Sequence, residues 1–198
     1  MIELFRKLRL FYLLYFKWRR YSFGSNPYIG RSVYLWAKHT ITVGENFYIG
    51  KFSQIECDAK IGNDVMFGNF VALIGKYDHD YSQVGMPIRI ADRIRDENYN
   101  WKGLNEMVII EDDVWVGHGS IILSGIRIGQ GSIIAAGSVV TKNVDSCSIY
   151  AGNPARKIKN RFETEAERTE HIKLLSKRYS TTSSGYVKAK TSDIRPSL

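Results

Sequence analysis

The chain has 198 residues, of which 44% are hydrophobic and 13% aromatic. This length fits one folded domain with extensions, and this composition argues against a disordered chain. The formal net charge of +8 indicates anionic partners, but the charge is divided between a hydrophobic N-terminal segment and a mixed-charge C-terminal part. A nucleic-acid-binding protein gathers its basic residues on one face, so this class is disfavoured.

The N-terminal segment, residues 1–24, is basic and amphipathic, with six basic residues against one acidic residue in 1–22. Its longest apolar run has seven residues, well below the roughly 20 that cross a bilayer. No small-residue cleavage site follows, so we expect no secretory signal. One interpretation, which we favour, is a helix that caps the open end of the fold. The other is a helix lying on an anionic membrane, which would immerse Leu10, Leu13, Leu14 and Phe16.

A six-residue period dominates the middle of the chain, in two arrays of six turns each. The first position of every turn is a large apolar residue. These positions are Val43, Ile49, Ile55, Ile61, Phe67 and Leu73, and then Ile110, Val116, Ile122, Ile128, Ile134 and Val140. Helices repeat apolar residues every three or four positions and single strands every two, so this period predicts a parallel β-solenoid.

Three hexapeptides make one coil of 18 residues, so Val43 should stack on Ile61 and Ile110 on Ile128. Neighbouring coils would lie about 4.8 Å apart, joined by backbone hydrogen bonds along the axis. The turns that precede Val43 are two residues out of phase with the array. We take Ile41-Thr42 as the small irregularity that causes this shift. A β-sandwich with accidental spacing is the alternative.

The period is lost over residues 79–109, a long excursion from a coil domain that we assign to 25–154. Loops above about 12–15 residues commonly serve as lids or binding loops. The remaining part, 155–198, should contain a helix near 163–178, since Thr164 and Glu167 have the spacing of a capping box, and a tail with little fixed structure from Ser180.

Three motifs make the comparison with a known family specific: V-W-V-G-H-G at Val114, A-A-G-S-V-V-T-K at Ala135 and Y-A-G-N-P-A-R at Tyr150. In these motifs the chain resembles the hexapeptide-repeat acetyltransferases, in the style of the galactoside, maltose and xenobiotic branch and of polysaccharide O-acetyltransferases. The resemblance covers about Ile29 to Lys159. It implies a left-handed parallel β-helix, a homotrimer, and acetyl-CoA in a groove between two subunits.

His79, in D-H-D-Y-S at the start of the excursion, is the candidate catalytic base. Acyl transfer to a hydroxyl needs a group near neutral pKa that takes the acceptor proton, and the family has a catalytic His at the matching position. The alternative is an exposed loop histidine. Asp78, Asp80 or a backbone carbonyl could orient its ring, and His118 is the rival base.

CoA carries phosphates and a pantetheine arm, so its groove should offer cations and an apolar wall. The positions that match the family's groove are Trp115, Gly117, His118 and Ala136 for the wall, and Thr141, Lys142, Arg156 and Lys159 for the nucleotide end. The alternative for Lys142 is an ordinary surface charge.

The excursion also supplies side chains suited to stacking on and hydrogen-bonding a sugar ring. The candidate acceptor-binding residues are Asp78, Asp80, Tyr81, Tyr99 and Trp101. These aromatic residues could instead pack the loop against a neighbouring subunit. The polar acceptor contact of the galactoside and maltose branch has no counterpart, because Phe52 stands at the aligned position.

The sequence therefore indicates an acetyl-CoA-dependent O-acetyltransferase acting on a sugar hydroxyl, in surface polysaccharide biosynthesis. Alternatives are a xenobiotic or amino-sugar acceptor, or a non-catalytic or metal-binding β-helix. His79 and His118 have no histidine at an 18-residue offset, so we expect no metal. Two cysteines without metal-ligand spacing favour a reducing cytoplasm, with possible peripheral contact at the inner face of the membrane through 1–22.

Overall fold

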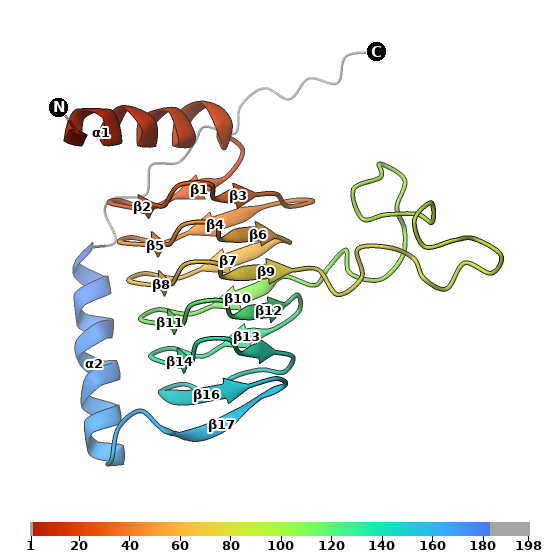
Figure 1. Ribbon diagram of the computed structural model, residues 1–198. Helices are drawn as coiled ribbons and strands as arrows, with labels where there is room; N and C mark the ends of the chain where they lie inside the picture. Colours follow the sequence, from red (N-terminus) through yellow and green to blue (C-terminus); the bar gives the residue numbers. More distant parts are fainter. Residues whose placement is uncertain (1, 183–198) are drawn as a thin grey trace.

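The computed structural model describes residues 2–182, and the side chains of residues 4–180. It is a stack of three-sided coils with one helix across the first coil, a long loop projecting from the side, and a second helix alongside (Figure 1). The tail expected to lack fixed structure lies outside the described residues beyond 182.

Each coil contributes one short strand to each of three sheets, here called A, B and C. Sheet A contains, in order, β1 (Ser22–Phe23), β4 (Ile41–Val43), β7 (Ala59–Ile61), β10 (Val108–Ile110) and β13 (Arg127–Ile128). Sheet B contains β2 (Tyr28–Ile29), β5 (Tyr48–Ile49), β8 (Met66–Phe67), β11 (Trp115–Val116), β14 (Ile133–Ile134), β16 (Ser148–Gly152) and β17 (Ala155–Asn160). Sheet C contains β3 (Tyr34–Leu35), β6 (Gln54–Glu56), β9 (Ala72–Ile74), β12 (Ile121–Leu123) and β15 (Val139–Val140).

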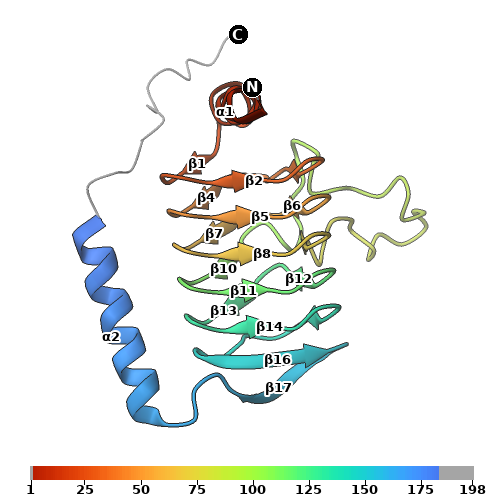
Figure 2. The ribbon, with the colours of Figure 1, turned by 60° about the vertical axis from the view of Figure 1, so that its left-hand side comes forward.

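The predicted solenoid is confirmed, and its core is the stack of first-position side chains. All twelve are no more than 2% exposed. Val43 pairs with Ile61 and Ile110 with Ile128, the two registers expected from the 18-residue coil. In Figure 2, β2, β5 and β8 run left to right on the near side and the chain returns behind, one level lower, so the coil is left-handed.

Backbone hydrogen bonds run along the axis, and side chains complete them at the corners. Gly44 and Gly62 donate N–H to the carbonyls of Ile61 and Ile110, at 2.8 Å each. At the same corner, Asp112 Oδ1 accepts from the Asn63 N–H at 2.6 Å. A Cβ on Gly62 would lie 2.7 Å from the Asp112 nitrogen, so only glycine fits where these coils stack.

The position assigned to the irregularity was wrong. Ile41-Thr42 belongs to β4, which pairs regularly with β7. The two extra residues lie in the preceding corner, residues 36–40, since Phe23 pairs with Val43 twenty positions later. Asp58 holds this wide corner, because its Oδ1 accepts from the N–H groups of His39 at 2.8 Å and Thr40 at 3.0 Å.

The coil is longer than the expected 25–154. It begins at Ser22, where β1 pairs with β4, and its last sheet extends to Asn160, because β17 pairs antiparallel with β16. The excursion also differs from 79–109: the strands end at Ile74 and resume at Val108. Ile61 pairs directly with Ile110, so the stack continues in register across the loop.

The N-terminal segment forms α1 (Ile2–Tyr12), which continues as a π-helical turn, η1 (Leu13–Lys17). Figure 1 shows this helix lying across the first coil. Leu13 and Trp18 are buried there, and Arg9 donates to the carbonyls of Ile29 and Gly30 at 2.8 and 2.6 Å. The capping interpretation is confirmed, because Arg9 satisfies acceptors that have no further coil above them.

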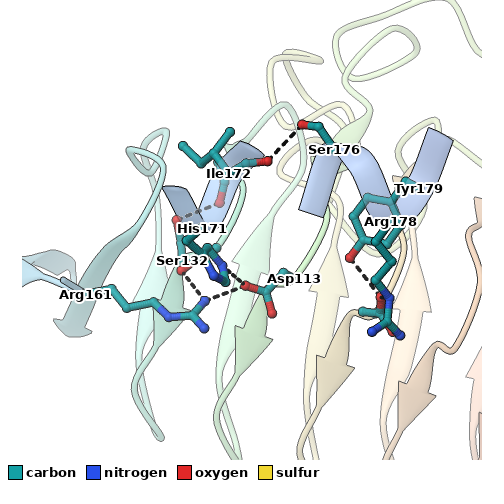
Figure 3. Close-up of polar contacts among 11 residues, drawn as sticks. Asp113, Ser132, Arg161, His171, Ile172, Ser176, Arg178 and Tyr179 are labelled. Atoms are coloured by element: carbon teal, nitrogen blue, oxygen red, sulfur yellow. Dashed lines mark hydrogen bonds and ion pairs between the residues drawn. The ribbon is translucent and has the colours of Figure 1, made fainter. Parts of the chain in front are cut away.

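The expected C-terminal helix is α2 (Glu165–Thr182), and it runs back along the stack (Figure 2). Its side toward the coils makes polar contacts (Figure 3). His171 Nε2 lies 2.8 Å from an Asp113 carboxylate oxygen, and the Tyr179 hydroxyl donates to Asp64 at 2.8 Å. Within residues 2–182, neither helix has the length and apolar character to cross a membrane.

Ile110→Ala should lower the free energy of unfolding by about 2–5 kcal/mol, because it removes a fully buried side chain and leaves a cavity. Ile109→Ala, one position earlier on the same strand, is the control, since Ile109 points outward and is 37% exposed. Its cost should stay below about 1 kcal/mol. Denaturant unfolding measures both, and equal losses would contradict the inward stack.

Candidate functional site

His79 stands at the base of the excursion, where the two arms of the loop meet. It forms an antiparallel β-bridge with Arg93. On either side, Asp80 N–H donates to the Asp92 carbonyl at 2.8 Å, and Ile94 N–H donates to the Asp78 carbonyl at 3.0 Å. The backbone of His79 is therefore held in place although the loop projects from the coil.

The ring of His79 is oriented by a backbone carbonyl. Its Nδ1 lies 3.0 Å from the Ile88 carbonyl oxygen. A carbonyl only accepts hydrogen bonds, so in the neutral ring Nδ1 carries the proton and Nε2 has the free lone pair. Among the described residues, no carboxylate is hydrogen-bonded to this ring, and Asp80 instead accepts from Ser82 N–H at 2.9 Å. Of the three groups expected to orient the ring, Asp78, Asp80 or a backbone carbonyl, the carbonyl is the one observed.

A cavity of about 440 Å³ lies beside His79. Its lining residues are Trp36, Glu56, Asp78, His79, Arg89, Arg93, Ile94 and Arg95. Three arginines thus surround the candidate base, and our sequence reasoning missed all of them. The available signal was the R-I-A-D-R-I-R run, Arg89 to Arg95, inside the predicted acceptor loop.

The three arginines differ in what they already bind. Arg95 donates to Glu56 at 2.7 Å and stacks on Trp36 at 4.1 Å, so it holds the loop against the coil. Arg93 pairs with Asp96 at 3.0 Å inside the loop. Arg89 is exposed and makes no ion pair among the described residues. It is the arginine whose charge faces the cavity without a carboxylate partner.

Asp78 is an uncompensated carboxyl beside this cavity. Its Oδ1 is buried and has no hydrogen-bond partner among the described residues. Burial, and then the charge of Glu56, raise the pKa of Asp78 above its ordinary value, while Arg95 and His79 oppose the shift. Such uncompensated burial is typical of functional sites.

The aromatic residues of the loop pack mainly against one another. Tyr99 is 5% exposed, its hydroxyl lies 2.8 Å from the Tyr77 carbonyl, and burial raises its pKa to about 12. Tyr81 and Trp101 meet edge to face at 4.7 Å. Tyr99 is therefore committed to loop packing, whereas Tyr81 remains 56% exposed.

The residues expected to form the pantetheine wall gather where sheet B turns into sheet C. Trp115 projects outward from β11 and is 48% exposed. Gly117 lies under the next coil, where a Cβ would be 2.5 Å from the Ala136 nitrogen. His118 contacts the ring of Phe70 at 5.3 Å, an aromatic environment unlike that of a hydrogen-bonded base.

The four residues expected at the nucleotide end lie at the last coils. Thr141 and Lys142 directly follow β15, and Arg156 and Lys159 lie on β17. The three cations are exposed, and none has an ion-pair partner among the described residues. Exposed cations of this kind fit the phosphates of a ligand such as CoA, and Thr141 and Lys142 follow sheet C, at a different corner from Trp115.

One chain does not bring all these residues together. His79 lies in the loop that leaves sheet C on the way to sheet A, whereas Trp115, His118 and Ala136 lie around the corner between sheets B and C. The candidate base and the candidate wall are therefore on different corners of the coil.

The remaining histidines have structural partners. His39 Nδ1 lies 2.6 Å from Asp58, and His171 contacts Asp113. In the part of the chain that the structure describes, no group of three or more His, Cys, Asp or Glu side chains could hold a metal ion.

Comparison with known proteins agrees with the repeat. Residues 40–75 and 107–142 match a family model described as bacterial transferase hexapeptide (six repeats). A 2,3,4,5-tetrahydropyridine-2,6-dicarboxylate N-acetyltransferase of Staphylococcus aureus is 44% identical over 70 residues, 35% of this chain. That match spans only 29% of the length of this curated relative.

Two solved structures are similar over most of the chain. A maltose O-acetyltransferase from Clostridium difficile 630 is 32% identical, with 71% of each chain covered and a TM-score of 0.47. A hexapeptide-repeat acetyltransferase from Vibrio cholerae O1 biovar eltor, solved with acetyl coenzyme A, is 22% identical. It covers 71% of this chain and 73% of its own, with a TM-score of 0.54, and shares the fold.

Asp78→Asn should raise the thermal midpoint at pH 7. The folded-state pKa of Asp78 is above its ordinary 3.8, so ionisation costs stability as pH rises from about 4 through that raised pKa. A neutral amide avoids this cost, and the gain should vanish near pH 4. Asp80→Asn is the control and should give no gain, because Asp80 is hydrogen-bonded. A lower midpoint for Asp78→Asn at pH 7 would contradict the desolvated carboxyl.

Proposed function

Because the chain belongs to the hexapeptide-repeat transferases, we propose that it transfers an acetyl group from acetyl-CoA to a sugar hydroxyl, with His79 as general base. The observation that carries this proposal is the contact of 3.0 Å between His79 Nδ1 and the Ile88 carbonyl oxygen. This contact engages Nδ1, which leaves Nε2 as the basic nitrogen beside a cavity.

His79 Nε2 takes the proton of the acceptor hydroxyl as that oxygen attacks the acetyl carbonyl carbon. The carbon–sulfur bond then breaks, and the imidazolium returns the proton to the departing thiolate. Proton transfer of this kind contributes about 10²–10⁴ in rate.

The donor groove follows from the positions of the remaining candidates. Trp115, Gly117, His118 and Ala136 supply its wall, and Thr141, Lys142, Arg156 and Lys159 bind the nucleotide end. Because wall and base lie on different corners of one chain, a complete site requires a second copy. We therefore place the site between subunits of a homotrimer.

The acceptor is a saccharide, bound in the cavity that His79 and Asp78 line, whereas Asp80, Tyr81, Tyr99 and Trp101 are not among the lining residues. A sugar that carries a carboxylate or phosphate suits this cavity best, because Arg89 has no ion-pair partner in the described chain. Acidic surface polysaccharide units made in the cytoplasm have this chemistry. An amino-sugar acceptor is the alternative, since the relatives include both O- and N-acetyltransferases.

His79→Asn should lower kcat by about 10²–10⁴, because the variant lacks the base. The asparagine amide N–H replaces the Nδ1–H donor to Ile88, so the loop stays clamped. Release of free thiol from acetyl-CoA measures the rate. His118→Ala is the control and should raise the KM for acetyl-CoA with a smaller change in kcat. An inactive His118→Ala variant together with an active His79→Asn variant would contradict the assignment of His79 as the general base.

Arg89→Gln should raise the KM for acidic sugar acceptors about tenfold, the effect of losing one charge-assisted contact of about 1.4 kcal/mol. Neutral sugars should be unaffected. A panel of neutral, acidic and amino sugars, scored by thiol release, checks both the charge preference and the attacked group. Activity on amines alone would contradict acetyl transfer to a hydroxyl and would indicate that the enzyme forms an amide.

A further inference from the structure

The helix that caps the coil has two apolar faces, and capping uses only one. Leu13 is 6% exposed, and Leu10 and Leu14 pack against the core from the same side. The opposite face carries seven large apolar side chains, each 53–64% exposed. They are Leu4, Phe5, Leu8, Phe11, Tyr12, Tyr15 and Phe16.

These seven residues, which we call the outer face, form one continuous stripe. Their spacing of three and four positions keeps them on one side of α1 and η1. Four of them also contact one another, since Phe11 lies 4.7 Å from Tyr15 and Tyr12 lies 6.1 Å from Phe16, between ring centroids. A contiguous exposed apolar patch of this kind marks an interaction surface.

Charge distinguishes the possible occupants of the outer face. Residues 1–22 contain six basic residues and one acidic residue, a net +5. Arg9 and Arg20 are committed to carbonyls of the first coil, as Arg20 donates to Lys38 at 3.0 Å. Arg6 and Lys7 line a cavity between the helix and Tyr28, and Lys17 Nζ lies 5.3 Å from the centroid of the Trp18 ring, so their charge adds to the same end of the molecule. A second copy of this helix would bring the same positive charge, whereas an anionic surface complements it.

We propose that the outer face binds an anionic lipid bilayer, with α1 lying in the plane of the headgroups. The helix and its π-helical turn have 11 and 5 residues, too short to span a bilayer and suited to lying on it. Tyr12 and Tyr15 have amphipathic rings that sit well at the headgroup level. Figure 1 shows α1 lying across the stack, so the coils extend away from the membrane.

This orientation has a consequence that rests on the proposed function. The loop with His79 leaves the third strand of sheet C, after β3 and β6. Two coil spacings and one helix diameter put that level roughly 20 Å from the lipid surface. A saccharide attached to a membrane lipid reaches this height with a few sugar rings. Lipid binding itself requires no acetyl transfer, so it is tested separately.

The test is flotation of the full chain with vesicles of phosphatidylcholine alone or mixed with phosphatidylglycerol. The protein should float with the anionic vesicles, at least tenfold more than with neutral ones, and high salt should release it. Phe5→Ser, Phe11→Ser and Phe16→Ser together should abolish at least nine-tenths of the binding. No flotation of the unaltered protein with anionic vesicles would overturn the proposal.

The matched control changes three exposed apolar residues elsewhere, Val84→Ser, Ile88→Ser and Ile90→Ser in the loop. This control should float as the unaltered protein does. Phe11→Ser alone, with an unchanged thermal midpoint, separates lost binding from lost folding. Light scattering tests the alternative that a second copy of the chain occupies the outer face. If the outer-face variant changes oligomeric state and still floats, a second copy covers the face and the proposal is wrong.

Discussion

One buried aliphatic or aromatic side chain at every sixth position is the constraint on which the rest of the structure depends. Each such side chain stacks on its counterpart one coil away, and burial of each stabilises the fold by about 1.5–3 kcal/mol. Backbone hydrogen bonds along the axis fix the spacing of the coils, but they do not depend on which side chains the turns carry. Because the stack closes directly from Ile61 to Ile110, the chain accommodates a 33-residue departure, from 75 to 107, without loss of register.

That tolerance is what makes room for a functional loop. The coil supplies a rigid edge, and the loop returns to it through contacts that have nothing to do with the repeat. Arg95 reaches back to Glu56 and Trp36, and Ile88 orients His79. The rigid coil and the tethered loop together hold His79, the proposed base, in a defined orientation beside a cavity lined by three arginines. Both ends of the coil are closed as well, one by α1 and the other by the antiparallel β17.

The coil was predictable because its signal is local and repeated. Twelve inward positions, two registers and the Thr164–Glu167 capping box follow from spacing alone, and the capping hydrogen bonds are present at 3.0 and 3.2 Å. The wide corner at 36–40 was misplaced, because it depends on an aspartate 18 or more residues away. Arg95 was missed for the same reason: its partners Glu56 and Trp36 lie 39 and 59 positions away in the sequence, beyond any periodic pattern.

The central claim is that an acetyl-transfer site is completed between two copies of the chain, with His79 from one and the wall from another. Mixing two inactive variants tests it most directly: His79→Asn, which lacks the base, and Ala136→Asp, which blocks the wall. If they are refolded together, random trimers should recover about one quarter of the original thiol-release rate, since one interface in four pairs an intact base with an intact wall. No recovery above the separate variants, in trimers shown to be mixed, would contradict a shared site.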